Sequence, residues 1–329
     1  WAPVGLALPG DTENVFVCPD GQTCFLPFGA LLDPDKRFLG DKLLVMCLST
    51  ARDLFQFGGP QPTGNRDFTV FAAPSYGQVA STGTEAHARF RDVDARALGG
   101  LRLTDLPGSR AEAEKLKTLA SEQRFTPTVF LGDSASKQNV YALRQPRVVH
   151  FATHGFFLPA TLAGLPGNPM DRSGLALAGA HVTLEALANG TTLPAAANDG
   201  LLTAREVARL PLAGTWIATL SACDTGRGEA RDGEGVLGLR RGFMAAGVQN
   251  LVITLWNISD QETVGFMRDF YARALDSSDP ATAFAQTQRE WLNRLRKERG
   301  IAAAVTSAGA FVLNTSARLP KPPASGESK

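Results

Sequence analysis

Two reactive side chains each follow a short apolar run of the strand type. His154 comes after residues 148–152 and is followed at once by Gly155, and Cys223 comes after residues 216–220. A thiol is a weak nucleophile until a base takes its proton, and a neighbouring imidazole does this well. The two residues therefore predict nucleophilic attack by Cys223 on a carbonyl carbon, with His154 as the general base.

Attack on a carbonyl creates an oxyanion, which needs hydrogen-bond donors that are already in place. Gly155 has no Cβ, so a substrate can approach its backbone N–H closely. We expect the N–H groups of Gly155 and Cys223 to form this oxyanion hole. The alternative is that Cys223 is a small buried residue and His154 an ordinary loop residue.

Apolar runs alternate with helical patterns over most of the chain. The runs lie at residues 68–73, 128–131, 148–152, 216–220 and 251–256, and the helical patterns at 109–120, 134–143, 203–210, 236–246, 264–274 and 280–295. Continuous apolar strands separated by helices indicate an α/β fold with a parallel sheet covered on both faces, and residues 311–313 are a further strand candidate. Ligands of such sheets bind beyond the carboxyl ends of the strands, where His154 and Cys223 both lie.

Two helix starts are expected from local signals. Ser109 and Glu112 have the spacing of a capping box, in which each side chain bonds the backbone N–H of the other. Asp279 followed by Pro280 is typical of an N-cap and a first helical residue.

The N-terminal third has a β-rich pattern. Residues 15–18 and 23–26 flank a Pro-Asp-Gly turn, which predicts a hairpin, and residues 42–48 are a further strand candidate. Residues 57–67 are rich in Gly, Pro and Asn. We therefore divide the chain into an N-terminal part at 1–66, a main domain at 67–319 and a disordered tail at 320–329.

Composition excludes several classes of partner. The 329 residues carry a net charge of only +1 and no long basic run, so direct nucleic-acid binding is not expected. Apolar runs stay far below the roughly 20 residues of a membrane-spanning helix. The four cysteines and four histidines lack zinc-ligand spacing, so no metal or cofactor is expected. We expect a cytoplasmic protein, or a periplasmic one if Cys18 and Cys24 form a disulfide across their turn.

Four ordered motifs resemble the CHAT peptidase family, whose members are caspase-like, are related to separase and often follow tetratricopeptide repeats. They are VHFATHG at 149–155, LSACDTG at 220–226, GEGVLGL at 233–239 and TLWNISD at 254–260. Weaker matches at 19–21, 26–28 and 30–31 extend the likeness to about residues 1–315, and residues 308–313 depart from the family pattern. The resemblance implies a caspase-like three-layer α/β/α sandwich with a mostly parallel central sheet, preceded by a β-rich N-terminal segment.

The same resemblance implies a function and its residues. The family's catalytic pair maps onto His154 and Cys223, and its backbone donor onto Gly155. A cysteine endopeptidase acting on a specific protein is thus implied, activated by an upstream sensor or tetratricopeptide-repeat segment; some bacterial members act in defence. The rival interpretation is a non-proteolytic interaction module on the same fold.

Two carboxylates are candidates for recognising the side chain before the cleaved bond, the P1 residue. Asp260 follows the strand at 251–256 at the same sheet edge, and a carboxylate there suits a basic P1 side chain, as related separases prefer. Asp224, next to Cys223, is the second candidate. Asp260 has an alternative role in a helix-capping pattern with Ser259 and Glu262, and Asp224 an alternative role as a turn residue.

Three further features lie near the expected site. His150, four residues before His154, is either a core histidine or a support for the catalytic pair. Residues 227–235 are polar and Gly-rich and are interpreted either as a mobile wall of the cleft or as a plain loop. Residues 158–200 are expected to overhang the cleft, with a short strand at 173–178.

Overall fold

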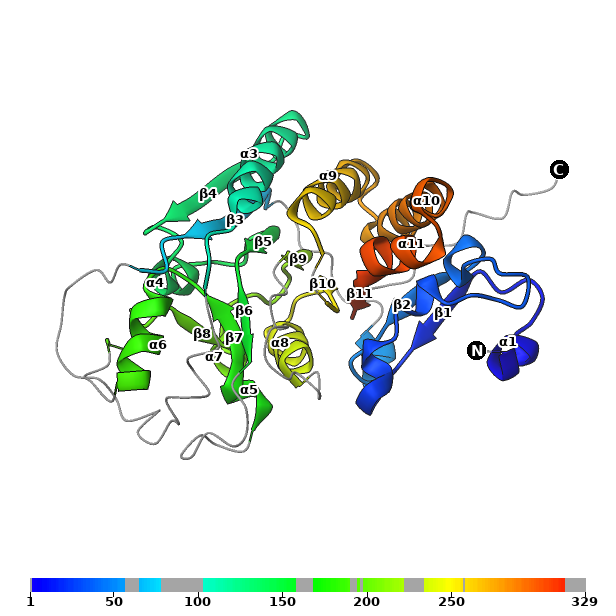
Figure 1. Cartoon of the computed structure of the whole chain (residues 1–329), viewed down its shortest axis with the longest axis horizontal. Helices are drawn as coiled ribbons and strands as arrows, with labels where there is room; N and C mark the ends of the chain where they lie inside the picture. The colour runs from blue at the N-terminus through cyan, green and yellow to red at the C-terminus, as the bar shows by residue number, and fades with distance from the viewer. Residues whose placement is uncertain are drawn as a thin grey trace.

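Eight strands form one central sheet in the order β1-β2-β11-β10-β9-β5-β3-β4 (Figure 1). The computed structural model describes residues 2–56, 65–77, 103–157, 168–189, 194–195, 198–221, 234–256 and 258–316. The strands of this sheet are β1 (Asn14–Val17), β2 (Leu44–Cys47), β3 (Asp67–Pro74), β4 (Thr126–Gly132), β5 (Val148–Ala152), β9 (Ile217–Leu220), β10 (Asn250–Thr254) and β11 (Phe311–Thr315).

The sheet is mostly parallel. Strands β4, β3, β5, β9 and β10 pair in parallel in that order, and only the pairing of β10 with β11 is antiparallel. Strand β2 pairs in parallel with both β1 and β11. The carboxyl ends of β3, β5, β9 and β10 therefore meet at one edge of the sheet, as the apolar runs predicted.

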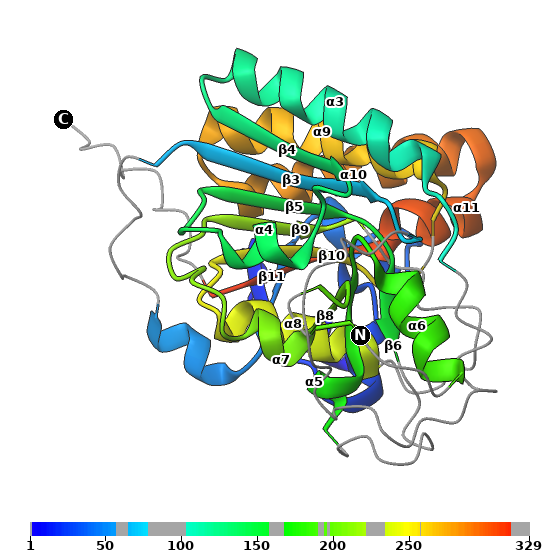
Figure 2. The ribbon, with the colours of Figure 1, turned by 90° about the vertical axis from the view of Figure 1, so that its left-hand side faces the viewer.

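Helices cover both faces of this sheet (Figure 2). One layer contains α3 (Pro107–Glu122), α9 (Asp260–Ser277), α10 (Pro280–Arg299) and α11 (Ile301–Ser307), and the other contains α4 (Lys137–Tyr141), α7 (Ala204–Val207) and α8 (Glu234–Ala245). This arrangement confirms the expected three-layer α/β/α sandwich.

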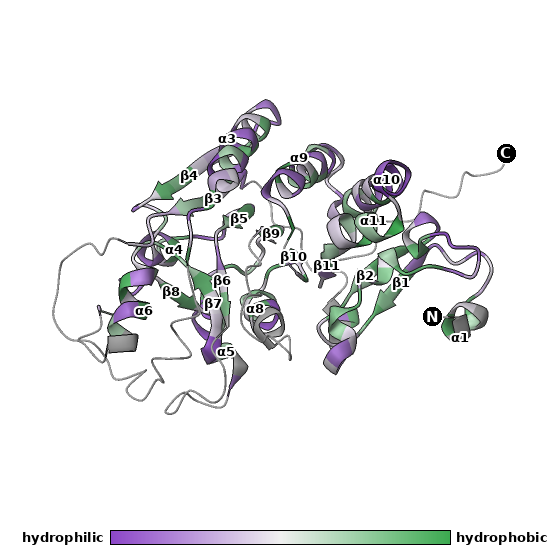
Figure 3. Ribbon diagram, in the orientation of Figure 1, coloured by the Kyte–Doolittle hydropathy of each residue, from purple (hydrophilic) through white to green (hydrophobic). Residues whose placement is uncertain are grey.

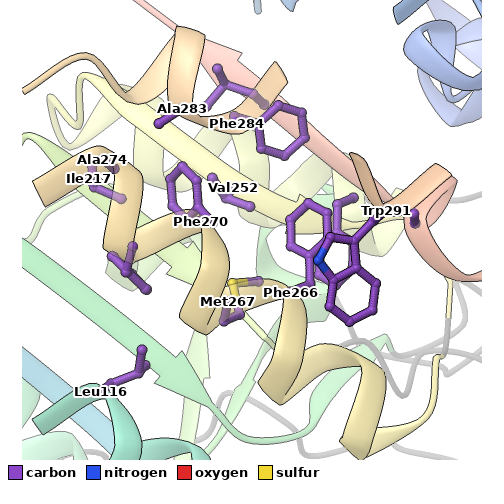
Figure 4. Close-up of a cluster of buried hydrophobic side chains, with 14 of the residues drawn as sticks. Leu116, Ile217, Val252, Phe266, Met267, Phe270, Ala274, Ala283, Phe284 and Trp291 are labelled. Carbon is purple, nitrogen blue, oxygen red and sulfur yellow. The ribbon is translucent and has the colours of Figure 1, made fainter. Parts of the chain in front are cut away.

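Each face of the sheet has its own apolar core, because successive side chains of a strand point to opposite faces. In β5, Val148 and Ala152 pack under α3 and α9, and Val149 and Phe151 pack under the α4, α7 and α8 layer. The first core contains several aromatic side chains, among them those of Phe266, Phe270 and Trp291 (Figure 4). The rings of Phe266 and Phe311 stack 3.8 Å apart. Burying one such side chain stabilises the fold by about 1.5–3 kcal/mol. The outer helices keep hydrophilic residues on their free faces (Figure 3).

The N-terminal part extends the same sheet. The hairpin predicted for residues 15–26 is not formed, so that prediction is wrong. Residues 21–25 form a 3-10 helix instead of a second strand, because the Asp20 side chain accepts a hydrogen bond from Gly21 N–H and Thr23 bonds the Asp20 backbone. Strand β1 pairs with the distant β2. The N-terminal part begins with α1 (Ala2–Ala7). Its 3-10 helices are Gly21–Phe25, Phe28–Ala30, Leu39–Asp41 and Ala51–Gln56.

Two helix starts have different outcomes. Asp279 caps α10 and Pro280 is its first residue, as predicted. Helix α3, by contrast, begins at Pro107, two residues before the expected N-cap. The capping box of Ser109 and Glu112 is therefore wrong, since both side chains are buried and bond the central strands instead.

A second, three-stranded antiparallel sheet follows directly after His154. Its strands are β6 (Gly155–Phe157), β7 (Ser173–Ala176) and β8 (Leu201–Thr203), flanked by α5 (Pro169–Arg172) and α6 (Ala180–Asn189). The strands approach closely at Gly174, where an added Cβ would lie 2.2 Å from the carbonyl oxygen of Leu202. Strand β7 confirms the short strand expected inside residues 158–200.

Candidate active site

His154 lies just beyond the carboxyl end of β5 and is buried. Its Nε2 atom is 2.7 Å from the carbonyl oxygen of Thr104, in the segment that leads into α3. A carbonyl oxygen only accepts, so Nε2 carries the hydrogen, and the neutral ring then has its lone pair on Nδ1. The His154 ring is thus held in one tautomer by a backbone group that sequence analysis did not find.

Tyr76 supports the backbone around this histidine. The Tyr76 hydroxyl lies 3.3 Å from His154 N–H and 2.9 Å from the Thr153 hydroxyl, and its ring centroid is 5.4 Å from that of His154. Thr153 in turn donates to the carbonyl oxygen of Ala176 in β7. These bonds join the ends of β3 and β5 to the small sheet, so His154 is placed by buried structure rather than by a free loop.

Gly155 begins β6 at the edge of the small sheet. Ala176 N–H donates to His154 carbonyl oxygen over 2.8 Å, and Gly155 stands opposite Leu175 in the antiparallel pair. Bonded and non-bonded pairs alternate along such a ladder, so Gly155 belongs to a non-bonded pair and its N–H points away from β7. The geometry therefore leaves this donor directed out of the small sheet.

The chain that leads to Cys223 runs beside the chain that leads to His154. Strands β5 and β9 pair in register, with Phe151 opposite Leu220, and Ser221 N–H donates to Phe151 carbonyl oxygen over 2.9 Å. Ser221 precedes Cys223 by two residues in the sequence. Cys223, Asp224 and residues 227–233 of the loop expected at 227–235 lie outside the described residues, and the last two residues of that loop begin α8 instead.

Asp260 is the first residue of α9, behind its N-cap Ser259. Its Oδ2 atom accepts a hydrogen bond from Gly108 N–H over 3.1 Å, at the first turn of α3. The segment 104–108 thus contacts His154 through its first residue and Asp260 through its last. Asp260 is half-buried and lies at the same sheet edge as His154.

His150 belongs to a buried polar cluster on the α3 side of the sheet. Its ring contacts Glu112 and Tyr271, and Glu112 also accepts from Ser221. Of these side chains, the sequence indicates only His150 as a possible support for the site. The spacing of Glu112 predicts a helix cap, and no local pattern marks the tertiary contact that this residue makes.

A second buried charge cluster lies on the opposite side of the sheet. The Lys137 ammonium is 2.7 Å from Asp199 and 3.2 Å from Glu206, and also donates to the carbonyl oxygen of Leu201. Burial raises the pKa of Asp199 to about 6, although the nearby ammonium opposes this shift. The cluster joins α4 to β8 and α7.

The remaining cysteines are free thiols. Cys18 is exposed, Cys24 is half-buried and Cys47 is buried, and the Cys24 thiol donates to the carbonyl oxygen of Pro19 over 3.2 Å. Burial raises the pKa of Cys47 to about 11. Throughout the described part of the chain, no group of His, Cys, Asp and Glu side chains has the arrangement of a metal site. Among those same residues, no helix is long and apolar enough to cross a membrane.

A mostly parallel sheet between two helix layers, with a buried histidine beyond one central strand, defines a caspase-like α/β protein. Comparison with models of protein families matches residues 1–317 to the CHAT domain. The match spans nearly the whole chain, and the chain belongs to the CHAT domain family. A search of curated proteins gave no match.

Proposed function

We propose that this chain is a cysteine endopeptidase that cleaves a specific protein partner, with Cys223 as nucleophile and His154 as base. The observation that carries the proposal is the position of His154. Its ring is fixed through Nε2 by Thr104, and the strand that leads to it pairs in register with the strand that leads to Cys223. Membership of a caspase-like family supports the same chemistry.

In this mechanism Nδ1 of His154 takes the proton of the Cys223 thiol. The thiolate adds to the scissile carbonyl carbon, and the tetrahedral intermediate expels the amine, which receives the proton from His154. Water, deprotonated by the same imidazole, then attacks the thioester, the C–S bond breaks and the acid is released. The imidazolium returns its proton to the Cys223 thiolate. The carbonyl oxygen of Thr104 accepts from Nε2–H throughout, so Nδ1 exchanges the proton in every step.

The developing oxyanion accepts hydrogen bonds from the N–H groups of Gly155 and Cys223. The position of Gly155 in a non-bonded pair of β6 and β7 supports this role, because its N–H is directed away from β7. Removal of one fixed donor of this kind lowers kcat by roughly 10²- to 10³-fold.

Recognition of a basic P1 residue is the finer part of the proposal. Asp260 and His154 are bonded to the two ends of segment 104–108, which supports a carboxylate close to the base. Oδ2 of Asp260 already accepts the hydrogen bond from Gly108 N–H, so a guanidinium or ammonium group would bind through Oδ1. Asp224 is the alternative carboxylate for the same side chain.

Activation by an upstream sensor or tetratricopeptide-repeat segment also belongs to the proposal, since members of the family often follow such repeats. We place the protein in the cytoplasm, where the free thiols of Cys18 and Cys24 stay reduced.

The experiment that tests the function is incubation of the full chain with a P1-varied peptide library, beside Cys223→Ala. Cleavage after Arg or Lys that disappears in Cys223→Ala is expected. Cleavage that persists at the wild-type rate in Cys223→Ala contradicts the assignment. If neither protein cleaves and a Cys223-directed electrophile does not react faster than with a free thiol, the non-proteolytic interaction module is the better description.

A further inference from the structure

A polar cluster is buried between the sheet and helices α3 and α9, directly behind the strand ends of the proposed site. It consists of Glu112 from α3, His150 from β5, Thr219 and Ser221 from β9 and its end, and Tyr271 from α9. All are buried except Ser221, which is half-buried. None of them takes part in the mechanism described above.

The carboxylate of Glu112 joins the two strands that lead to the proposed catalytic pair. The Ser221 hydroxyl lies 3.0 and 2.9 Å from the two carboxylate oxygens. His150 Nε2 lies 3.3 Å from Glu112 Oε1, a close contact without hydrogen-bond geometry. Ser221 is two residues before Cys223 and His150 four residues before His154, so one side chain contacts both strand ends.

The other side of the cluster fixes the His150 ring. Its Nδ1 atom lies 3.3 Å from the Tyr271 hydroxyl, which is 2.6 Å from the Thr219 hydroxyl. Thr219 is the residue opposite His150 in the parallel pair. Burial raises the pKa of Tyr271, so its hydroxyl stays a neutral hydrogen-bonding group. The imidazole thus has a contact on each ring nitrogen.

The same turn of α3 also bonds the ends of two neighbouring strands. Ser109 Oγ accepts from Ala73 N–H of β3 over 2.8 Å and donates to the Ala152 carbonyl oxygen of β5. Five residues before Ser109, Thr104 bonds His154. Residues 104–112, which include the first turns of α3, therefore contact the ends of β3, β5 and β9 around the proposed catalytic histidine.

Stability alone is a poor explanation for this cluster. A buried polar cluster that includes a carboxylate contributes little net stability compared with apolar residues of the same volume, because its groups lose their hydration. The best-attested use of such buried polar groups is to specify one arrangement. Here the arrangement specified is the relative position of the ends of β5 and β9.

We propose that Glu112 is a positioning residue, which sets the separation of the His154 and Cys223 backbones through His150 and Ser221. The inference rests on the proposed function. Cysteine activation depends on the distance between thiol and imidazole, and a displacement of about 1 Å costs roughly 10²-fold in rate. A variant in which the two strand ends are no longer held together should therefore have a lower kcat and an unchanged KM.

The test compares Glu112→Leu, Glu112→Gln and Ser221→Ala with the wild type. Glu112→Gln keeps the shape and can still accept from Ser221, Ser221→Ala removes only the contact with β9, and Glu112→Leu removes both. Glu206→Gln is the matched control, because Glu206 is a half-buried carboxylate that lies beside Lys137, away from the Glu112 cluster. Three quantities are measured: kcat and KM on the best peptide, and the pH midpoint of Cys223 alkylation, which is followed by mass spectrometry of the Cys223 peptide.

We expect Glu112→Leu to lower kcat by about 10- to 100-fold with KM within about twofold, and to move the alkylation midpoint towards the value of a free thiol, about 8.5. Glu112→Gln and Ser221→Ala should change kcat and the alkylation midpoint in the same direction but by a smaller amount. Glu206→Gln should leave the alkylation midpoint unchanged. A folded Glu112→Leu with unchanged kcat and midpoint overturns the inference. If that variant does not fold, unchanged values in both milder variants overturn it.

The two proposals fail in different ways. A wild type that cleaves no peptide removes the proposed function, and the alkylation midpoints then decide the role of Glu112 by themselves. A wild type that cleaves normally, with midpoint and kcat insensitive to all three variants, removes the role of Glu112 and keeps the peptidase.

Discussion

His154 is oriented by Thr104 through the backbone: Nε2 lies 2.7 Å from a main-chain carbonyl oxygen rather than from a carboxylate. This arrangement selects the tautomer without placing a negative charge beside the ring. It also means that replacing the Thr104 side chain removes none of the orienting group. The function of the histidine is therefore best tested at the ring itself.

Replacement of His154 by Ala should leave the Cys223 thiol largely protonated at pH 7, because a free thiol has a pKa of about 8.5. We expect alkylation of Cys223 at pH 7 to slow by about tenfold or more, and peptide cleavage to be lost. The measurement is the rate of iodoacetamide incorporation at Cys223. His181→Ala is the control, since His181 is half-buried on α6, where it pairs with Glu185. Equal alkylation rates in His154→Ala and wild type would show that His154 is not the base.

Asp260→Asn separates the two roles open to this residue. An amide oxygen can still accept from Gly108 N–H, so the contact between α9 and α3 is kept and the unfolding midpoint should change little. If Asp260 binds the P1 side chain, discrimination in favour of Arg and Lys should fall by roughly 2–5 kcal/mol, by analogy with truncated buried charge pairs. The measurement is kcat/KM for peptides that differ only at P1.

Asp269→Asn on the same helix is the control for this variant, since Asp269 accepts from Trp291 Nε1 on α10, 2.9 Å away. It should leave the P1 preference unchanged. A wild-type preference for Asp or for large apolar residues at P1 would rule out Asp260 as the specificity carboxylate.

The sequence predicted those features that depend on local periodicity. Strand β5 was expected at its observed bounds, and the alternation of apolar runs with helices led to the parallel sheet and to the common edge of the strand ends. Asp279 and Pro280 marked a helix start because both act within one turn. Such signals lie within a few neighbouring residues, so a single sequence contains them in full.

The features that were missed depend on partners far away in the chain. Strand β1 pairs with β2, about thirty residues on, so its local turn signal pointed to the wrong neighbour. Glu112 has the spacing of a cap, but its partner Ser221 is 109 residues away. The carbonyl of Thr104 has no sequence signature, because every residue carries the same backbone carbonyl group whatever its side chain is.

Lys137→Met should destabilise the fold. The substitution leaves the buried Asp199 and the half-buried Glu206 without their cation. Removal of one partner of a buried ion pair costs about 3–5 kcal/mol. Urea unfolding of the full chain measures the change. Lys115→Met, on the exposed side of α3, is the control and should stay within about 0.5 kcal/mol of wild type. A loss below about 1 kcal/mol for Lys137→Met would show that the two carboxylates find other compensation.

Asp199 should make stability depend on pH in a direction opposite to most carboxylates. Burial raises its pKa to about 6 in the folded chain, against about 3.9 in an unfolded one. Between these values the native state binds more protons than the unfolded state, so this group's contribution to stability is full below about pH 4 and is lost as the pH rises through about 6. Glu206 has the opposite sign: burial acts to raise its pKa, but the Lys137 ammonium and the Thr203 hydrogen bonds hold it below its ordinary value.

Comparison with Asp199→Asn isolates the Asp199 contribution, because Asn does not titrate and Glu206 is present in both proteins. The free energy of unfolding of the wild type, minus that of Asp199→Asn, should fall by up to about 3 kcal/mol between pH 4 and pH 7, the equivalent of the difference between the two pKa values. Urea titrations at half-unit steps of pH provide the measurement. A difference that is flat over this range, or that rises with pH, would mean that the Lys137 ammonium outweighs burial and that Asp199 is ionised throughout.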